Sequence, residues 1–252
     1  MECSEVAGII KNSRRTVAFT GAGISVESGI PPFRGENGLW NKYNPKYLDI
    51  NYFLNEPEQC WKIIKEIFYD YFGRAKPNAA HITLAEMEKQ GYLKALITQN
   101  IDNLHQEAGS RNVYEFHGAS HTLLCMSCFK KYSVNEDILG QLPPRCPECG
   151  GLLKPDFVFF GEPIPADVSR ASFKEAEDSD VFIVIGTTGE VMPASLLAYT
   201  AKQRGAVLIE VNLTESKYTN EVTDYFLQGK ATEIMEQLAA DLGMADSGAA
   251  YK

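Results

Sequence analysis

Four of the six cysteines in this 252-residue chain fall into two Cys-x-x-Cys pairs. Cys125 and Cys128 form the first pair, Cys146 and Cys149 form the second, and 17 residues lie between the pairs. Each pair presents two thiolates from one tight turn, and two such turns facing each other make a tetrahedral site for Zn²⁺. This spacing is typical of a zinc ribbon, and a site with four thiolates is closed to substrate. We therefore predict one structural zinc ion held by these four cysteines.

Charge bears on whether this zinc module binds nucleic acid. Its basic and acidic side chains balance, with Lys130, Lys131 and Arg145 against Glu136, Asp137 and Glu148. The whole chain has a formal net charge of −9. Proteins that bind the phosphate backbone present clustered Lys and Arg instead. We therefore expect a scaffold with no direct contact to nucleic acid.

The glycine-rich run at 20–35 offers a second kind of chemistry. It follows the short apolar segment Thr16–Phe19, and a strand that runs into Gly-x-Gly presents bare backbone N–H groups to a phosphate. A dehydrogenase fingerprint would place a third glycine where Val26 stands, and an acid about 20 residues further on to bind a ribose. The chain instead continues into Pro31-Pro32-Phe33-Arg34-Gly35. The run predicts a dinucleotide site unlike that of an ordinary dehydrogenase, with a purely structural turn as the alternative.

One of the four histidines stands apart from the others. His117 ends an apolar run and is followed by glycine, and a neutral imidazole in that position can take a proton from a bound hydroxyl. His81 and His105 fall in helix-like segments, and His121 opens the cysteine-bearing segment. We expect these three to be structural and His117 to be a general base.

The elements that must position these groups alternate along the chain. Helix-like stretches at Ala79–Gln90, Ala194–Arg204 and Ala231–Leu242 lie between short apolar runs typical of strands that are covered on both faces. Six such runs are present, at Thr16–Phe19, Leu93–Ile97, Val113–Phe116, Phe157–Phe160, Val181–Ile185 and Val207–Val211. This alternation predicts an α/β fold with a doubly wound, mainly parallel sheet.

A polar or glycine motif follows each of the six expected strands. These motifs are Gly21-Ala-Gly23, Thr98-Gln99-Asn100-Ile101-Asp102, His117-Gly118, Gly161-Glu162, Gly186-Thr187-Thr188-Gly189 and Asn212. Ligands of open α/β sheets bind at the carboxyl ends of the strands. The motifs are therefore expected to line one cleft.

Two insertions interrupt the alternation. Residues 36–78 are rich in aromatic side chains and resemble a small helical unit, and residues 119–152 carry the four cysteines. The large domain then comprises residues 1–35, 79–118 and 153–252. No signal-peptide pattern and no apolar run of about 20 residues is present, which predicts a soluble, cytoplasmic protein without a membrane partner. The sequence carries no signal for an oligomeric state.

The ordered set of motifs resembles the sirtuins, the silent-information-regulator family of NAD-dependent protein deacylases, and a prokaryotic deacetylase is the expected member. The motifs that carry the resemblance are Gly21-Ala-Gly-Ile-Ser25, Phe33-Arg34-Gly35, Gln99-Asn100-Ile101-Asp102, His117-Gly118, the paired Cys-x-x-Cys, Phe160-Gly161-Glu162 and Gly186-Thr187. The resemblance spans about residues 8 to 242. It implies a Rossmann-like large domain and a small domain built from the helical and zinc-ribbon insertions. NAD, as a consumed co-substrate, and an acetyl-lysine protein would meet between them.

The resemblance also implies roles for individual residues. His117 would be the general base, with Asn100 and Asp102 beside it in the catalytic group. NAD would contact Gly21, Ala22, Gly23, Ser25, Phe33, Arg34, Gln99, Asn100, Ile101 and Asp102 around the pyrophosphate and nicotinamide riboside, and Gly186, Thr187, Thr188, Asn212, Leu213, Lys230 and Ala231 around the adenosine. The substrate peptide would add as a strand between Val158, Phe159, Phe160, Gly161 and Glu162 on one side and Gly189, Glu190 and Val191 on the other. Many relatives have Ser and a larger apolar residue in place of Thr188-Gly189, which leaves the contact at Gly189 open.

The implied reaction transfers the acetyl group to ADP-ribose and releases nicotinamide, free lysine and O-acetyl-ADP-ribose. ADP-ribosyl transfer to protein and removal of other acyl groups are alternatives that use the same cleft. A hydride-transfer oxidoreductase and a non-enzymatic zinc-ribbon module are further readings, disfavoured by the missing fingerprint and by the crowded cleft edge.

The acyl preference is predicted from a second resemblance. Sirtuins that prefer succinyl or malonyl lysine carry a Tyr-x-x-Arg pair whose Arg pairs with the acyl carboxylate. Anchored on Glu56-Pro57 and Trp61, the equivalent positions are Ile64 and Ile67, which favours a small neutral acyl group. Tyr71-Phe-Gly-Arg74 spells the same pattern seven residues later, and we interpret it as coincidence.

Overall fold

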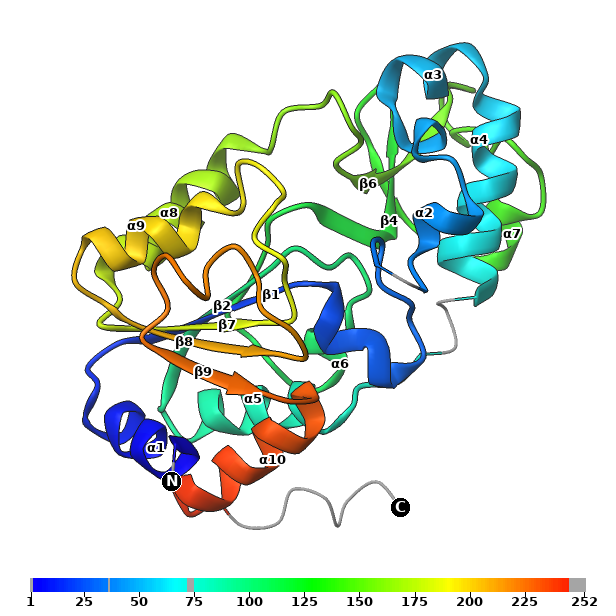
Figure 1. Cartoon of the computed structure of the whole chain (residues 1–252). Coiled ribbons are helices and arrows are strands. Elements are labelled where there is room, and N and C mark those ends of the chain that lie inside the picture. Colours follow the sequence, from blue (N-terminus) through cyan, green and yellow to red (C-terminus); the bar gives the residue numbers. More distant parts are fainter. Residues whose placement is uncertain (1, 36, 72–74, 245–252) are drawn as a thin grey trace.

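The computed structural model describes residues 2–35, 37–71 and 75–244, and its centre is a six-stranded parallel sheet (Figure 1). The strands lie in the order β3-β2-β1-β7-β8-β9, and every neighbouring pair is parallel. Their bounds are β1 (Thr16–Thr20), β2 (Leu93–Thr98), β3 (Val113–Glu115), β7 (Val181–Ile185), β8 (Val207–Asn212) and β9 (Tyr225–Gln228). The chain winds outward from β1 in one direction and from β7 in the other, which gives a Rossmann-like sheet with its switch point between these two strands.

Helices cover both faces of this sheet (Figure 1). On one face lie α1 (Glu2–Asn12), α5 (Ala79–Lys89) and α10 (Ala231–Leu242), and on the other lie α8 (Ala166–Asp178) and α9 (Leu196–Gln203). Alternate residues of β1 point to opposite faces of the sheet. Ala18 packs into the core beneath α1, α5 and α10, whereas Val17 and Phe19 pack into the core beneath α8 and α9. Burial on both faces is the reason that the central strands are continuously apolar.

The expected strand at Phe157–Phe160 is wrong for the large sheet. Phe157 instead ends β6 (Leu153–Phe157), which belongs to a separate three-stranded antiparallel sheet with β4 (Gly118–Cys125) and β5 (Lys131–Ser133). The next residues leave that sheet, and Phe160 makes only an isolated bridge to Asp49. The sixth strand of the large sheet is β9, an edge strand that is only partly buried and whose apolar run, Tyr225–Leu227, is only three residues long.

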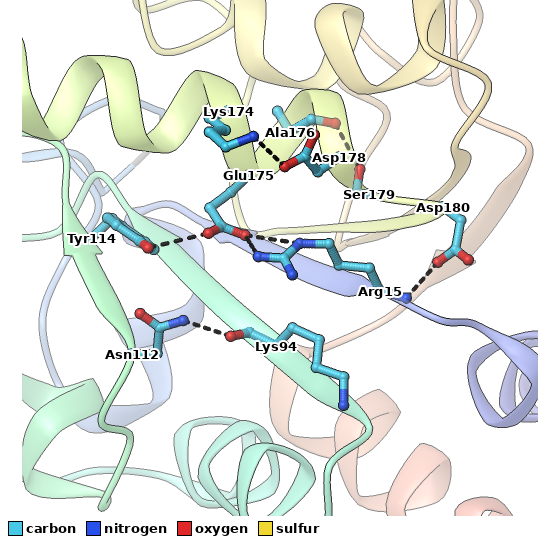
Figure 2. Close-up of polar contacts among 10 residues, drawn as sticks. All are labelled: Arg15, Lys94, Asn112, Tyr114, Lys174, Glu175, Ala176, Asp178, Ser179 and Asp180. Carbon is cyan, nitrogen blue, oxygen red and sulfur yellow. Dashed lines mark hydrogen bonds and ion pairs between the residues drawn. The ribbon is translucent and has the colours of Figure 1, made fainter.

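Helix α8 was not predicted from the sequence, because few of its residues are apolar. It contacts the sheet through apolar side chains such as Ala176 and through the polar contacts drawn in Figure 2. Glu175 of α8 accepts hydrogen bonds from the Arg15 guanidinium, just before β1, and from the Tyr114 hydroxyl of β3 at 3.2 Å. Asp180, after the helix, accepts from the backbone N–H groups of Arg14 and Arg15 at 2.9 and 2.8 Å. These carboxylates fix both α8 and the start of β7 against the amino end of β1.

The three-stranded sheet shares one apolar core with the helices of residues 37–71. These helices are α2 (Leu39–Lys42), the 3₁₀ turn η2 (Pro45–Leu48), α3 (Ile50–Asn55), α4 (Pro57–Ile64) and the π-helical turn η3 (Lys65–Tyr71), and α7 (Glu136–Leu139) completes the unit. Trp61 is fully buried there and donates its indole N–H to the carbonyl oxygen of Leu153 at 2.9 Å. Several aromatic side chains of the insertion, Phe53, Trp61 and Phe68 among them, therefore serve packing.

Within the described ranges, no helix has both the length and the apolar composition that crossing a bilayer requires.

Candidate active site

A cavity of about 820 Å³ lies at the carboxyl ends of the large-sheet strands, between that sheet and the smaller unit. Most of the residues predicted for cofactor and substrate line it. They are Gly21, Ala22, Gly23, Phe33, Arg34, Gln99, Asn100, Ile101, His117, Val158, Phe159, Phe160, Gly161, Glu162, Gly186, Thr187, Thr188, Val191, Asn212, Leu213, Lys230 and Ala231. The structure thus gathers motifs from all parts of the chain around one cavity.

The floor of this cavity is a contact between two glycine loops. Gly23 N–H donates to the carbonyl oxygen of Gly186 at 2.8 Å, so the loops after β1 and β7 touch backbone to backbone. A Cβ on Gly23 would lie 2.6 Å from Gly186 Cα, and Gly186 itself has a φ of 65°. Side chains would separate the loops, so the glycines allow this close backbone contact at the switch point of the sheet. The η1 turn (Ala22–Ser28) continues from the first loop.

Ser25 and Asp102 do not line the cavity, although the sequence analysis assigns both to the cofactor. Ser25 Oγ donates to Asp102 Oδ2 at 2.7 Å and accepts from Asn100 Nδ2 at 3.1 Å. Asn100 does line the cavity, and the same Nδ2 atom lies 3.2 Å from the Gly21 carbonyl oxygen. Burial raises the pKa of the Asp102 carboxyl, while the Leu104 backbone N–H and the Ser25 hydroxyl oppose that rise. The two residues therefore form a buried polar layer that holds Asn100 from behind.

Two buried histidines extend this layer away from the cavity. His81 Nε2 lies 3.4 Å from Ser25 Oγ, and its Nδ1 lies 3.0 Å from Oδ1 of Asn78, the N-cap of α5. His105, in α6 (Leu104–Glu107), packs against His81 with the two rings tilted and their centroids 4.8 Å apart. Burial lowers the pKa of His81 to about 3 and lowers that of His105 as well. Both rings are neutral at pH 7, in agreement with the structural role predicted for them.

These neutral rings make the stability of the protein depend on pH. The folded-state pKa of His81 lies below the value of 6.5 for an unfolded chain, so below pH 6.5 the unfolded state binds a proton that the folded state does not. The free energy of unfolding should therefore fall as pH falls from 6.5 towards about 3. Urea denaturation of wild type and His81→Gln at several pH values checks this, because the variant should show a shallower loss. The exposed His121, changed to Gln, is the control that should keep the wild-type slope. If the free energy of unfolding fell equally with pH in wild type and His81→Gln, His81 would not be the source of the pH dependence.

His117 lies at the edge of the cavity, directly before β4. Its Nδ1 lies 3.1 Å from the carbonyl oxygen of Gln99, which can only accept, so Nδ1 carries the proton. In the neutral ring, Nε2 then keeps its lone pair, as a general base requires. Burial lowers the pKa of His117 and the bond to Gln99 opposes that, so the ring is neutral at pH 7. Gly118 has a φ of 75°, and a Cβ there would lie 2.2 Å from the Asp156 carbonyl oxygen, so glycine is required beside His117.

Gly189 and Glu190, both predicted to contact the peptide, do not line the cavity. Gly189 packs flat on the buried Tyr218 ring, where a Cβ would lie 2.9 Å from Tyr218 Cε2. The sequence analysis also missed lining residues, among them Trp40, Phe68, Ile164 and Met192. Trp40 packs against Phe33 and Phe160 in tilted arrangements, with ring centroids 5.3 Å and 6.2 Å apart. No motif marks these residues, and only their aromatic or apolar character beside a known motif could have found them.

The four cysteines form a separate cluster in the smaller unit. Their Sγ atoms all lie within 4.8 Å of one another, with Cys125–Cys149 at 3.5 Å and Cys128–Cys146 at 3.7 Å. Zn–S bonds of about 2.3 Å place the sulfurs of a tetrahedral site about 3.8 Å apart, so the cluster fits one zinc ion. The Tyr132 hydroxyl lies 3.0 Å from Cys146 Sγ and can orient that ligand. The four cysteines therefore lie close enough together to hold the predicted zinc ion.

Comparison with known proteins places these features in one family. Residues 21–193 match the model of the Sir2 family. The NAD-dependent protein deacetylase 1 of Pyrobaculum aerophilum is 46% identical over 239 residues, which cover 94% of this chain and 93% of the relative. The NAD-dependent protein deacylase 1 of Archaeoglobus fulgidus is 46% identical over 230 residues, which cover 91% and 93%.

Solved structures agree with this assignment. A Sir2 complex with a p53 peptide and NAD⁺ superposes with a TM-score of 0.90 at 36% identity, covering 97% of this chain and all of that one. A Sir2 variant with a deacetylated p53 peptide and 3'-O-acetyl-ADP-ribose superposes with a TM-score of 0.91 at 38% identity, covering 96% and 99%. With the glycine switch point, the cavity histidine and the four-cysteine cluster in one chain, this protein belongs to the Sir2 family.

Proposed function

We propose that the protein is an NAD-dependent protein-lysine deacetylase, which transfers the acetyl group of acetyl-lysine to ADP-ribose. The observation that carries the proposal is the state of His117. Its Nδ1 is engaged by the Gln99 carbonyl oxygen and its Nε2 keeps a lone pair, in the same cavity as the glycine loops that suit a pyrophosphate. Relatives named NAD-dependent protein deacetylase or deacylase, at 42–46% identity, support the same activity.

The cavity can be divided by chemistry. The glycine loops after β1 and β7, which line the cavity without bulky side chains, suit the pyrophosphate, and Asn212 with Lys230 suits the adenosine end. Asn100, held by Ser25 and Asp102, suits the ribose that carries nicotinamide. Glu210, buried beneath this end, accepts a hydrogen bond from Asn212 at 2.9 Å and can orient it.

The reaction follows from these positions. The acyl oxygen of the substrate amide attacks the ribose carbon that bears nicotinamide, and nicotinamide departs. His117 then takes a proton from a ribose hydroxyl, which lets that oxygen attack the acyl carbon. Water completes the release of lysine and O-acetyl-ADP-ribose. NAD is consumed, which explains why hydride-transfer machinery is missing from the sequence.

In this proposal the two insertions have a structural role. Residues 36–78 and 119–152 would form a small domain, stabilised by one zinc ion, which faces the large domain of residues 1–35, 79–118 and 153–252 across the cavity. Protein substrates with acetyl-lysine would enter along Val158–Glu162, and the balanced charge of the zinc module supports a role without nucleic acid.

Mass spectrometry of a reaction with NAD and a panel of acyl-lysine peptides tests the proposal. The expected products are deacetylated peptide, nicotinamide and O-acetyl-ADP-ribose. A peptide that gains ADP-ribose and keeps its acetyl group would instead establish ADP-ribosyl transfer, and absorbance from reduced nicotinamide would establish hydride transfer. Either outcome in place of deacetylation would refute the proposal.

The acyl preference should be for acetyl over succinyl. Ile64 and Ile67 are buried in the core of the small unit and supply no charge, while the neighbouring Phe68 lines the cavity. With isoleucine rather than a cation at positions 64 and 67, desolvation of the succinyl carboxylate is costly, so kcat/KM for a succinyl peptide should be lower by roughly tenfold or more. Arg74 and the Tyr71 side chain lie outside the described residues.

Steady-state kcat/KM on matched acetyl and succinyl peptides measures this preference. Arg74→Ala is the matched variant, and it should leave the ratio of the two values unchanged. Comparable turnover of the succinyl peptide that disappears in Arg74→Ala would assign Tyr71 and Arg74 to the acyl pocket and overturn the prediction.

A further inference from the structure

Lys154 is a buried lysine that the proposed chemistry does not use. It lies on β6, directly after Leu153, which pairs with the zinc-cluster residue Cys125. Its side chain is only 4% exposed, and lysines are almost never buried without a partner. Its Nζ lies 2.9 Å from the Pro155 carbonyl oxygen, 2.7 Å from that of Phe157, and 4.2 Å above the Phe159 ring. The ammonium group is thus surrounded by the chain that leads into the cavity.

The charged partner of Lys154 is Glu162, whose Oε2 lies 3.0 Å from Nζ. The same oxygen accepts the backbone N–H of Phe159 at 2.8 Å, and Glu162 N–H donates to the Phe159 carbonyl oxygen at 3.0 Å. Glu162 lines the cavity, yet its carboxylate is used to close its own loop. One ion pair therefore joins the start and the end of residues 154–162.

The middle of this segment is fixed from the other side. Phe160 N–H donates to the Leu48 carbonyl oxygen at 2.8 Å, and Ile50 N–H donates to the Phe160 carbonyl oxygen at 3.0 Å. Val158 N–H donates to the carbonyl oxygen of His117 at 2.8 Å, which ties the segment to the general base. A peptide that adds as a strand forms hydrogen bonds with the backbone of such a segment. Binding is stronger when the segment already has the bound conformation, because less ordering is then needed.

We propose that Lys154 and Glu162 are a positioning pair that presets the segment Val158–Glu162 for the acyl-lysine peptide. The inference rests on the proposed function, because that function places the peptide on this segment. Lys154 holds two carbonyl oxygens and one carboxylate in place, and none of these contacts reaches the glycine loops at the NAD end. Loss of the pair should therefore weaken peptide binding and leave NAD binding in place.

Three variants separate the pair from a general packing effect. Lys154→Met keeps an unbranched side chain one atom shorter and leaves Glu162 without its cation, and Glu162→Gln leaves Lys154 without its anion. The double variant removes both charges, and replacing a whole buried pair is far less costly than breaking it. The double variant should therefore bind peptide better than Lys154→Met alone. Lys131→Met is the matched control, because exposed Lys131 pairs with Asp156 of β6 at 2.7 Å.

The experiment measures the affinity of the zinc-loaded protein for a labelled acetyl-lysine peptide by fluorescence anisotropy, its affinity for NAD by calorimetry, and both KM values. Lys154→Met and Glu162→Gln should each raise the peptide Kd and KM about tenfold, and the NAD Kd should stay within about twofold. The double variant should recover part of the loss, and Lys131→Met should match wild type.

Equal losses for peptide and NAD, or no recovery in the double variant, would overturn the inference. If Lys154→Met does not fold, Glu162→Gln tests the inference in the same way, by a loss of peptide affinity without a loss of NAD affinity. A wild-type protein that binds no acyl-lysine peptide would instead refute the proposed function, so the two failures are distinguishable.

Discussion

His117→Ala should abolish deacetylation while leaving NAD binding largely intact. The imidazole is expected to act after nicotinamide departs, so its removal costs the proton transfer and spares the contacts that hold the dinucleotide. General-base catalysis typically contributes about 10²–10⁴-fold in rate, and a loss of that size is expected in kcat. Single-turnover kinetics with an acetyl-lysine peptide and calorimetry with NAD measure the two effects separately.

The pH dependence of the same reaction gives a second measure of this residue. A general base must be unprotonated, and burial holds the pKa of His117 below its usual 6.5. The acidic limb of the kcat/KM profile should therefore lie below pH 6.5, with full activity retained at neutral pH. The exposed His121, changed to Ala, is the control for a histidine outside the cavity. Near-wild-type deacetylation by folded His117→Ala would show that another group is the base.

Zinc removal is expected to have the largest effect on stability. Thiolate–zinc binding contributes on the order of 10 kcal/mol of folding free energy in small modules. Cys146→Ser removes a ligand whose Sγ lies within 4.8 Å of the other three, and the shared core with Trp61 would lose its support. Peptide turnover should be lost together with the cooperative unfolding of the small unit.

Elemental analysis and thermal unfolding, before and after chelation, check this prediction. One zinc per chain is expected in wild type, and a large drop in melting temperature is expected after its removal. Cys3→Ser is the control for zinc content, because Cys3 lies in α1, far along the chain from the cluster, and its loss should leave one zinc per chain. Protein purified without chelators that contains no zinc and unfolds cooperatively would refute the assignment.

The sequence by itself determined the features whose chemistry is local. Two Cys-x-x-Cys turns can bring four sulfurs together because each turn already presents two, and the cluster has that form. The glycines after β1 and β7 follow buried strands, and close approach of backbone at a switch point requires residues without side chains. The parallel sheet followed from continuous apolar runs, because strands covered on both faces have few polar positions.

The tertiary structure decided what depends on partners distant in sequence. The run Phe157–Phe160 is typical of a core strand. In the structure Phe157 pairs with Gly118 of β4 and Phe160 hydrogen-bonds to Leu48, so the run belongs to the smaller unit. Four apolar residues do not specify which core covers them. Ser25 and Asp102 match a motif, and only the fold places them behind Asn100 and out of the cavity.

The same reason applies to the ion pair of Lys154 and Glu162. Nothing in the residue types indicates that the lysine is buried or that the carboxylate faces its own loop, because burial and pairing are set by the folded chain around them. Spacing along the chain determined the chemistry of each motif in this protein, and the packing of the small unit against the large sheet decided which of those groups face the cavity and which hold them in place.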